Sequence, residues 1–397
     1  MSLHPRALAL AAVTAASLVW GGMAAPAALA ETASLTDTAT LRETLITASP
    51  GSTGIADNLL TLDVDQPDGM VTYLSAPVVM SSHAQLALQQ IRDVRSRAWD
   101  ANPEMEFFSL KDYAVHTMTV RDAAAFEGLN TREEYLAAIT WDRGLEHAVI
   151  QRAAEENQDM THERPDGSPN STVLGPEAKL AENLTTADME HAVQSFLDGE
   201  WDKLLAGNYA AAGHVTSMLN PAFRSFAQAQ AGAITAQEFA WAPQGTEPAS
   251  VADGSYRIPV VMPLAKIQDV KASEVSTYVG DKGIVSATLG EQYGDYEIPG
   301  TYSSSDSAIL SVHPNGEYEN LAVGSASLIL TPVEMRNNAA TTAGFAHTQV
   351  IDITERPAGS SLGEGSSEGP GGIVGIVLGV LGLLVVALPA LGGLLGR

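Results

Sequence analysis

Two histidines and two glutamates stand in one central stretch of the chain: His162, Glu182, Glu200 and His214. Imidazole nitrogens and carboxylate oxygens can bind a divalent metal ion, and zinc suits this donor set best. The same groups serve as general acids and bases. Because the four residues are far apart in sequence, they form a site only if the fold brings them together. The alternative is a hydrogen-bonded network that holds loops in place, since buried polar groups need partners.

The residue types predict different roles within such a site. His162 and His214 can offer neutral nitrogens to Zn²⁺ and are the expected metal ligands. Glu182 or Glu200 could ligate the ion or orient an imidazole from behind. A water molecule on the ion would be more acidic than bulk water. No serine stands in a nucleophile motif and the chain has no cysteine, so the catalytic residues, and whether the protein is an enzyme, stay open.

Helices are predicted on both sides of this stretch. Apolar residues recur at close to helical spacing over 85–99. Thr131 and Glu134 match a capping box, which predicts that a helix begins there, and Asp142 is placed to cap the helix that follows. A further amphipathic helix is predicted from near Thr186, and its apolar stripe ends at Leu197. The apolar faces indicate packing against a common core.

Strand patterns follow the second histidine. Residues 222–230 and 233–241 are predicted strands, because the small residues between them can form a turn. From Ser255 to about Pro332, apolar and polar residues alternate between glycine turns, as in an all-β domain. Next to the first histidine, residues 164–167 (Arg-Pro-Asp-Gly) predict a tight turn. The predicted fold class is therefore α+β.

Charge and composition exclude some classes of function. The 397 residues include 47 acidic and 21 basic side chains, which gives a formal charge of −26. Phosphate binding needs a cationic face, so a nucleic-acid partner is not expected. An acidic, self-repelling surface suits a protein outside the cell. With no cysteine, such a protein depends on burial and not on disulfides for its stability.

The central stretch resembles the CAP superfamily, which comprises cysteine-rich secretory proteins, antigen five and pathogenesis-related one proteins, and the bacterial SCP-like extracellular members most of all. The resemblance covers roughly residues 84–242. Its motifs are His-Glu-Arg-Pro-Asp-Gly at 162–167, Ala-Glu-Asn at 181–183, Gly-His at 213–214 and Leu-Asn-Pro at 219–221. It implies an α-β-α sandwich in which two histidines and two acidic residues line a shallow cleft. Three of these are His162, Glu182 and His214. For the fourth, Gly199 aligns without a gap and Glu200 is the nearest glutamate.

Within a predicted domain at 255–335, roughly residues 264–333 resemble a bacterial immunoglobulin-like domain of the group-two type. A Ser-Ser-Ser-Asp turn at 303–306 precedes a short apolar strand, and Asn315-Gly316 forms a second turn. Gly-Ser-Ala at 324–326 then begins the closing strand. This resemblance implies a small β-sandwich that serves as a spacer or an adhesive module.

The two ends of the chain predict export and anchoring. Residues 1–30 match a signal peptide with a small-x-small cleavage site at Ala28-Leu29-Ala30, and residues 31–83 are expected to form an N-terminal arm. Residues 336–370 are the expected flexible tether, rich in Gly, Ser and Glu towards its end. Residues 371–396 contain no charged side chain and are long enough for a transmembrane helix. Localisation is thus expected at the cell membrane, single-pass, with an extracellular ectodomain.

Three functions remain open on these grounds. The first is a CAP-domain surface protein that binds a small apolar or lipid ligand, or a surface partner, at the His/Glu site, with or without a divalent metal. The second is a metal-assisted hydrolase of peptide or cell-envelope substrates. The third is a structural adhesion protein, in which the immunoglobulin-like domain makes the contacts.

Overall fold

The computed structural model describes residues 58–357, apart from 176, 177, 179, 245–249, 270, 338 and 345. The described residues up to Glu355 form one compact unit. The expected signal peptide, the end of the tether and the expected transmembrane segment lie outside the described residues. Within the described part of the chain, no helix has the length and apolar character needed to span a membrane.

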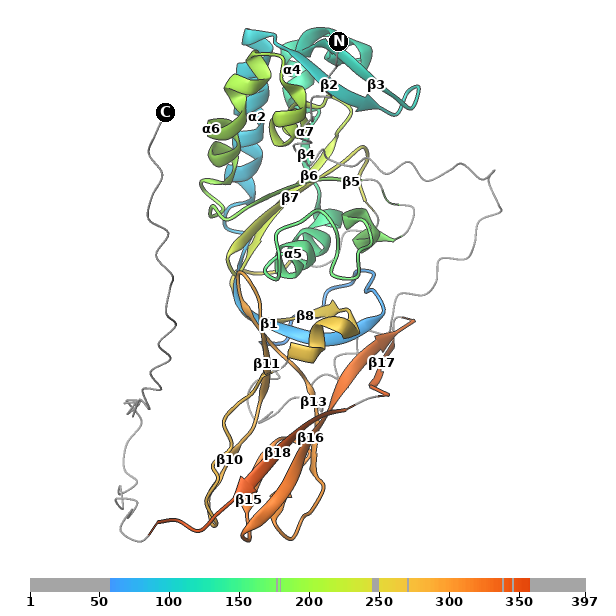
Figure 1. The fold of residues 1–397 in the computed structure, drawn as a ribbon. Helices are drawn as coiled ribbons and strands as arrows, with labels where there is room; N and C mark the ends of the chain where they lie inside the picture. Colours follow the sequence, from blue (N-terminus) through green and yellow to red (C-terminus); the bar gives the residue numbers. More distant parts are fainter. Residues whose placement is uncertain are drawn as a thin grey trace, which may run out of the picture. The chain divides into compact units, whose positions relative to one another are not determined.

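An antiparallel sheet lies at the centre of the helical region (Figure 1). Its strand order is β5 (Leu180–Thr185), β7 (Ile234–Ala240), β6 (Ser225–Ala231) and β1 (Gly69–Val79), and the short β4 (Thr140–Trp141) pairs with β6 in parallel. The expected strand pair is therefore confirmed, with slightly later starts. Gly232 makes the turn at φ 63°, a left-handed conformation that favours glycine.

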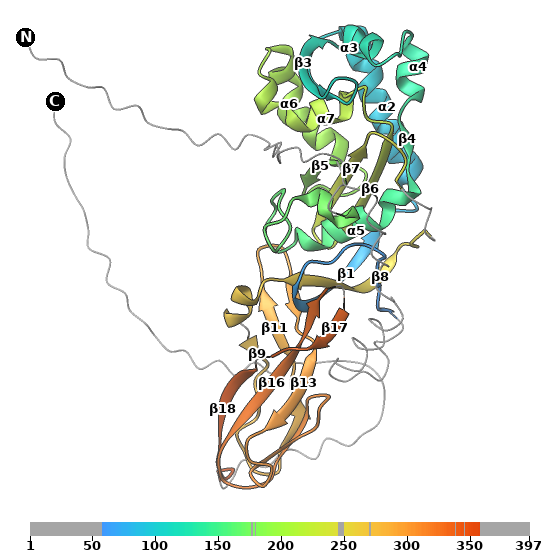
Figure 2. The same ribbon diagram turned by 90° about the vertical axis from the view of Figure 1, so that its right-hand side faces the viewer.

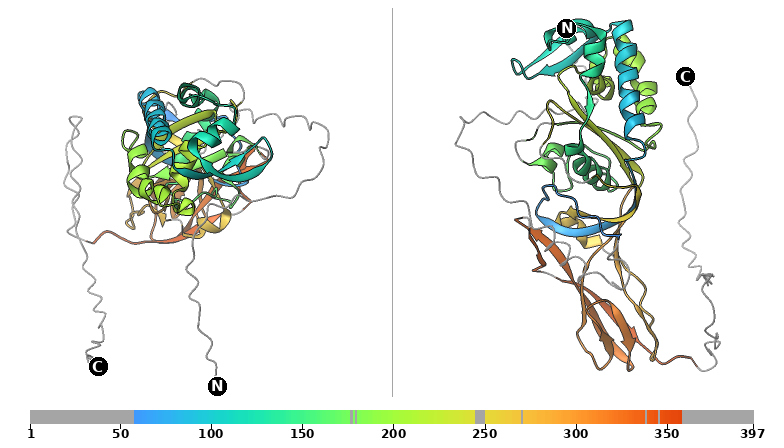
Figure 3. Two further views of the ribbon diagram at one scale, coloured as in Figure 1. Left: turned by 90° about the horizontal axis from the view of Figure 1, so that it is seen from above. Right: turned by 180° about the vertical axis from the view of Figure 1, so that it is seen from behind.

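Both faces of this sheet are covered. Alternate residues of β6 and β7 pack into two different apolar clusters, as the two-residue period of a strand requires. One cluster includes α5 (Glu146–Glu155), and the other includes α2 (Ala84–Ala101), α6 (Ala192–Leu205) and α7 (Gly213–Leu219). Figures 2 and 3 show α5 across the sheet from α2 and α6.

Three of the four predicted helix starts agree with the structure, whereas the fourth helix was expected from near Thr186 and α6 begins only at Ala192. Helix α2 covers the expected segment, and α4 (Arg132–Ala137) begins at a complete capping box between Thr131 and Glu134. Asp142 caps a short 3₁₀ turn that leads directly into α5. The expected end of the fourth helix at Leu197 is wrong, because α6 continues to Leu205 and contains Glu200.

The remaining elements of the helical region are short. They are the hairpin β2 (Glu104–Ser109) and β3 (Ala114–Thr119), helix α3 (Val120–Phe126), and the 3₁₀ turns η2 (Arg143–Leu145), η3 (Asn170–Leu174) and η4 (Tyr209–Ala211).

The C-terminal part of the described chain consists mainly of strands, as the alternating pattern predicted. These are β8 (Gly254–Met262), β9 (Lys271–Ala272), β10 (Lys282–Ile284), β11 (Ala287–Gly290), β12 (Asp295–Glu297), β13 (Gly300–Ser304), β14 (Leu310–Val312), β15 (Glu317–Asn320), β16 (Gly324–Arg336), β17 (Ala339–Thr342) and β18 (His347–Ile353). One 3₁₀ turn, η5 (Leu264–Asp269), lies among them. With the helices described above, these strands place the fold in the α+β class.

Two expected boundaries are corrected by the strand pairing. The N-terminal arm was expected over 31–83, but residues 69–79 form β1, which pairs with β8 over nine positions from Met70↔Met262 to Val78↔Gly254. The tether was placed too early, because β17 and β18 both pair with β16.

Candidate functional site

The structure brings the four expected site residues together as two His–Glu pairs. His162 lies in the loop after α5, Glu182 is on β5, Glu200 is on α6, and His214 is in the first turn of α7. The two imidazole rings face each other with their centroids 6.4 Å apart and their planes inclined at 45°. Sequence separation therefore did not keep these residues apart in the fold.

In the first pair, a buried carboxylate holds a half-exposed imidazole. Nδ1 of His162 lies 3.1 Å from Oε1 of Glu182. The Glu182 side chain is fully buried, whereas the His162 side chain is 50% exposed. Because an ionised carboxylate only accepts, Nδ1 is the donor here. The ring edge that carries Nε2 is left for other partners.

The second pair is built by two helices. Oε1 of Glu200 lies 2.5 Å from Nδ1 of His214, and Oε2 accepts a 3.0 Å hydrogen bond from the Val215 backbone N–H. The Phe196 ring stacks on the His214 ring at 4.7 Å and 23°. Phe196 and Glu200 are four residues apart on α6 and so share a face of the helix. The continuation of α6 beyond Leu197 is what places this carboxylate beside His214.

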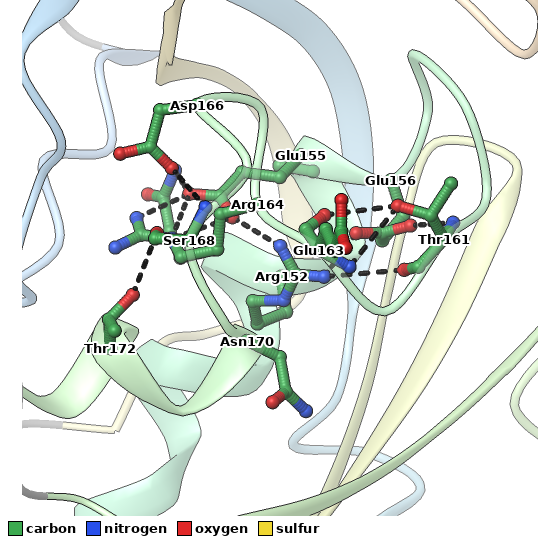
Figure 4. Close-up of polar contacts among 12 residues, drawn as sticks. Arg152, Glu155, Glu156, Thr161, Glu163, Arg164, Asp166, Ser168, Asn170 and Thr172 are labelled. Atoms are coloured by element: carbon green, nitrogen blue, oxygen red, sulfur yellow. Dashed lines mark hydrogen bonds and ion pairs between the residues drawn. The ribbon is translucent and has the colours of Figure 1, made fainter. Parts of the chain in front are cut away.

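A buried arginine lies behind Glu182. Arg152, on α5, donates from Nε to Oε2 of Glu182 at 2.8 Å and from Nη1 to Oε2 of Glu155 at 2.6 Å. Its Nη2 is hydrogen-bonded to Glu156 (Figure 4). Burial raises the pKa of Glu182, but the charge of Arg152 and the hydrogen bond from His162 outweigh it and lower this pKa to about 2. Glu182 is therefore ionised at neutral pH.

The turn after His162 is attached to the same network. Gly167 takes φ 83°, and its N–H donates to the Arg164 carbonyl at 2.8 Å, which confirms the predicted tight turn. The buried Arg164 guanidinium reaches back to Glu155, with Nη2 2.6 Å from Oε1 (Figure 4). Burial raises the pKa of Glu155, but Arg164 and Arg152 together lower it below its usual value. The loop that carries His162 is thus tied to α5 by a buried ion pair.

Two further buried carboxyl groups in this network have raised pKa values, and Glu156 also accepts from Arg152 and from the Thr161 backbone N–H. Burial raises the pKa of Glu156 to about 9 against the opposing charge of Arg152. Burial and the adjacent Glu182 raise the pKa of Glu238 well above its usual value. A proton on Glu238 would lower the negative charge buried beside Glu182. Uncompensated buried charge would be strongly destabilising.

A row of amide side chains supports the other histidine from the opposite face of the sheet. Nδ2 of Asn183 donates to the His214 carbonyl at 3.1 Å and to Oε1 of Gln237 at 2.9 Å. Gln237 donates in turn to Gln228 at 2.7 Å. The three residues lie opposite one another on β5, β7 and β6. The row fixes the start of α7 relative to β5.

The donor types fit a zinc ion, but the two imidazole rings lie farther apart than two ligands of one zinc ion would. Both imidazoles use Nδ1 on a carboxylate, the arrangement that usually orients zinc-binding histidines through the other nitrogen. With Zn–N distances of about 2.0 Å, two ligands on one tetrahedral ion bring the ring centres to about 5 Å. The observed 6.4 Å requires the rings to approach. In the described residues, no group of three or more His, Asp or Glu side chains is arranged as metal ligands, so a zinc ion here would need ligands beyond the two imidazoles.

Sequence reasoning missed the buried support of the site. It treated residues 164–167 as a turn only, and it did not single out Arg152, Glu156 or Glu238. One signal was available, because an arginine with glutamates three and four positions later stood among the apolar positions of α5. No pattern in the sequence marks Glu238, because its environment depends on strand pairing.

Comparison of the chain with protein-family models, with curated proteins and with solved structures finds no match.

Proposed function

We propose that the chain is a membrane-anchored CAP-domain surface protein that binds a ligand between His162 and His214. In this proposal, residues 84–242 form the CAP α-β-α sandwich, 255–335 an immunoglobulin-like sandwich and 371–396 a transmembrane helix after an exported N-terminus. Helices on both faces of the β5–β7–β6 sheet support the first assignment. The antiparallel strands from β10 to β16 support the second.

The observation that carries the proposal is the paired geometry of the two imidazoles. Both rings are held through Nδ1 by carboxylates, and both remain partly exposed, at 50% for His162 and 34% for His214. The alternative role, a hydrogen-bonded network that only holds loops in place, does not explain why both neighbouring rings are partly exposed to solvent. Preorganised rings with one nitrogen uncommitted are suited to receive a polar ligand group or a metal ion.

The ligand class we favour is a small lipid, whose polar head would meet the imidazoles while its apolar part lies against the protein. A divalent ion, zinc first, would join the polar head to the rings. His162 and His214 would hold that ion, and Glu182 and Glu200 would orient them. The ion would supply a positive charge to which an anionic head group can bind.

The test uses the full chain purified in detergent, analysed by native mass spectrometry and by zinc titration calorimetry. We expect a bound lipid or zinc, and its loss in both His162→Ala and His214→Ala. His191→Ala is the matched control, because His191 also pairs with a carboxylate, Asp188, at 2.7 Å but lies exposed at a helix start. Ligand retention in both site variants would contradict the proposal.

Hydrolysis is the second function to be distinguished, because a His–Glu pair is also the arrangement of a general base. The same preparations would be incubated with peptide and cell-envelope substrates. If the natural chain cleaves a substrate, and Glu200→Gln loses this cleavage but keeps the bound ligand, the function of the site is catalysis and not binding.

A further inference from the structure

Two glutamates face each other inside the protein on adjacent strands. Glu182 on β5 and Glu238 on β7 are directly opposite in the antiparallel register, so their side chains lie on the same face of the sheet, towards α5. Glu238 is fully buried. Neither of its carboxyl oxygens has a hydrogen-bond donor among the described residues. Its hydrogen-bonding neighbour is the carboxylate of Glu182.

The nearby cation is already engaged elsewhere. Arg152 is the arginine that acts on Glu238, and its guanidinium donates to Glu155, Glu156 and Glu182. None of its described hydrogen bonds reaches Glu238. An ionised Glu238 would therefore be buried without a donor and beside a second negative charge. Two adjacent carboxyl groups in that situation keep one proton between them.

The proton belongs on Glu238. Glu182 accepts from both Arg152 and His162, and these contacts favour its ionised form. Glu238 has no such contact. If both Glu182 and Glu238 were ionised, two acceptors would repel each other. When Glu238 is protonated, it donates to Glu182, and its carboxyl group, which has no other partner, gains one.

We propose that Glu238 is a positioning residue of the His162 side of the site: it carries a proton in the folded protein and donates it in a hydrogen bond to the Glu182 carboxylate. This inference rests on the proposed function only in treating His162 as part of the ligand site. The hydrogen bond fixes the rotation of the Glu182 carboxylate between α5 and β7. The oxygen that faces His162 is thereby held in place, and so is the Nδ1–H tautomer of the imidazole.

Two substitutions of similar size separate proton donation from packing. In Glu238→Gln, the amide N–H₂ replaces the acidic O–H as a donor to Glu182. In Glu238→Met, the volume is retained and the donor is lost. If Glu238 acts by donating, the glutamine variant behaves like the natural chain and the methionine variant does not. If Glu238 only fills space, the two variants behave alike.

The measurement is ¹⁵N NMR of histidine-labelled full-length protein in detergent, which reports the tautomer of each imidazole. We expect the His162 signals to be unchanged in Glu238→Gln and shifted towards a mixture of tautomers in Glu238→Met. The signals of His191 serve as an internal control. An unchanged His162 in the methionine variant, or equal shifts in both variants, would overturn the proposal.

Infrared spectroscopy provides a test that does not depend on the methionine variant folding. The natural chain should show, at neutral pH, the C=O band of a protonated carboxyl group that is lost in Glu238→Gln. A spectrum without that loss overturns the proposal. Both measurements are made without ligand, so a failure of zinc or lipid binding with the expected spectra would count against the proposed function alone.

Discussion

Glu182 and Asn183, consecutive on β5, each hold one histidine of the site from opposite faces of the strand. The Glu182 carboxylate accepts from Nδ1 of His162 at 3.1 Å, and the Asn183 amide donates to the His214 carbonyl at 3.1 Å. Alternation along a strand sends neighbouring side chains to opposite faces. A single edge strand therefore sets the relative position of two residues that come from separate segments of the chain.

Loss of Arg152 should be among the most damaging single changes. Arg152→Met removes the guanidinium that pairs with the buried Glu182 and one of the two that pair with Glu155, and it leaves Glu182 without its arginine. We expect a cost of about 3–5 kcal/mol in the free energy of unfolding. Chemical denaturation would measure this loss. Arg97→Met is the control, because the exposed Arg97 lies over the Trp201 ring at 3.9 Å, and losing that contact should cost only about 0.5–1 kcal/mol. Equal effects would show that the buried ion pairs contribute little.

Glu200 should act on the ligand site through His214. In Glu200→Gln the side chain keeps its size, but the charge-assisted hydrogen bond to Nδ1 is lost. If zinc binds, we expect its affinity to fall by about 10–100-fold, as for other carboxylates that orient metal-binding histidines. Zinc titration calorimetry would measure the change. Asp188→Asn, which alters the exposed His191 pair in the same way, should leave affinity unchanged, and an equal loss there would rule out a specific role for Glu200.

The amide row should stabilise the start of α7. Gln237→Leu removes the middle member and leaves the buried amides of Asn183 and Gln228 short of a partner, at about 1–3 kcal/mol each. Thermal unfolding would report the loss, and hydrogen exchange should show faster opening near His214. The exposed Gln194, which donates to Asp198, provides the control Gln194→Ala. Unchanged exchange at α7 would contradict the supporting role of the row.

The raised pKa of Glu238 predicts a pH dependence of stability. Between its ordinary value of 4.5 and its higher folded value, the folded protein binds more protons than the unfolded chain, so stability falls as pH rises. Glu238→Gln removes this proton. The variant should gain stability relative to the natural chain from pH 5 to pH 8, by up to about 1.4 kcal/mol per pH unit. Denaturation curves across this range would test it, and parallel profiles would count against a proton on Glu238.

The corrected end of the β-rich region can be tested by truncation. A chain that ends at residue 335 lacks β18, which pairs with β16 at seven positions from Gly324↔Ile353 to Leu330↔His347. We expect it to melt at a lower temperature or to aggregate, because β16 would expose an unpaired edge. A chain that ends at residue 357 keeps the pair and is the control. Identical melting would mean that β17 and β18 are dispensable.

Local patterns predicted many of the helices and strands, whereas the four expected site residues were chosen by residue type and by the CAP resemblance. The capping box at Thr131 and the turn at Gly167 depend on interactions within a few residues, so the sequence alone indicates them. The end of α6 was misplaced because its apolar stripe was traced only to Leu197, whereas Trp201 and Leu204 are also buried against the core.

The buried network could not be predicted in the same way. What distinguishes Glu238 from other glutamates on strands is its position opposite Glu182 in the β5–β7 pair. The sequence alone does not show how these two strands align. Likewise, β1 was expected to be part of an arm because its partners come much later in the chain. Long-range pairing and the dielectric environment it creates are properties of the whole fold.

The position of β1 also bears on how the protein is made. This strand is synthesised before its partners β6, β8, β12 and β16. Its mostly apolar residues therefore have no strand partner in the nascent chain until β6 and β8 have been synthesised. Until then, this apolar segment is a site at which a chaperone can bind the growing polypeptide.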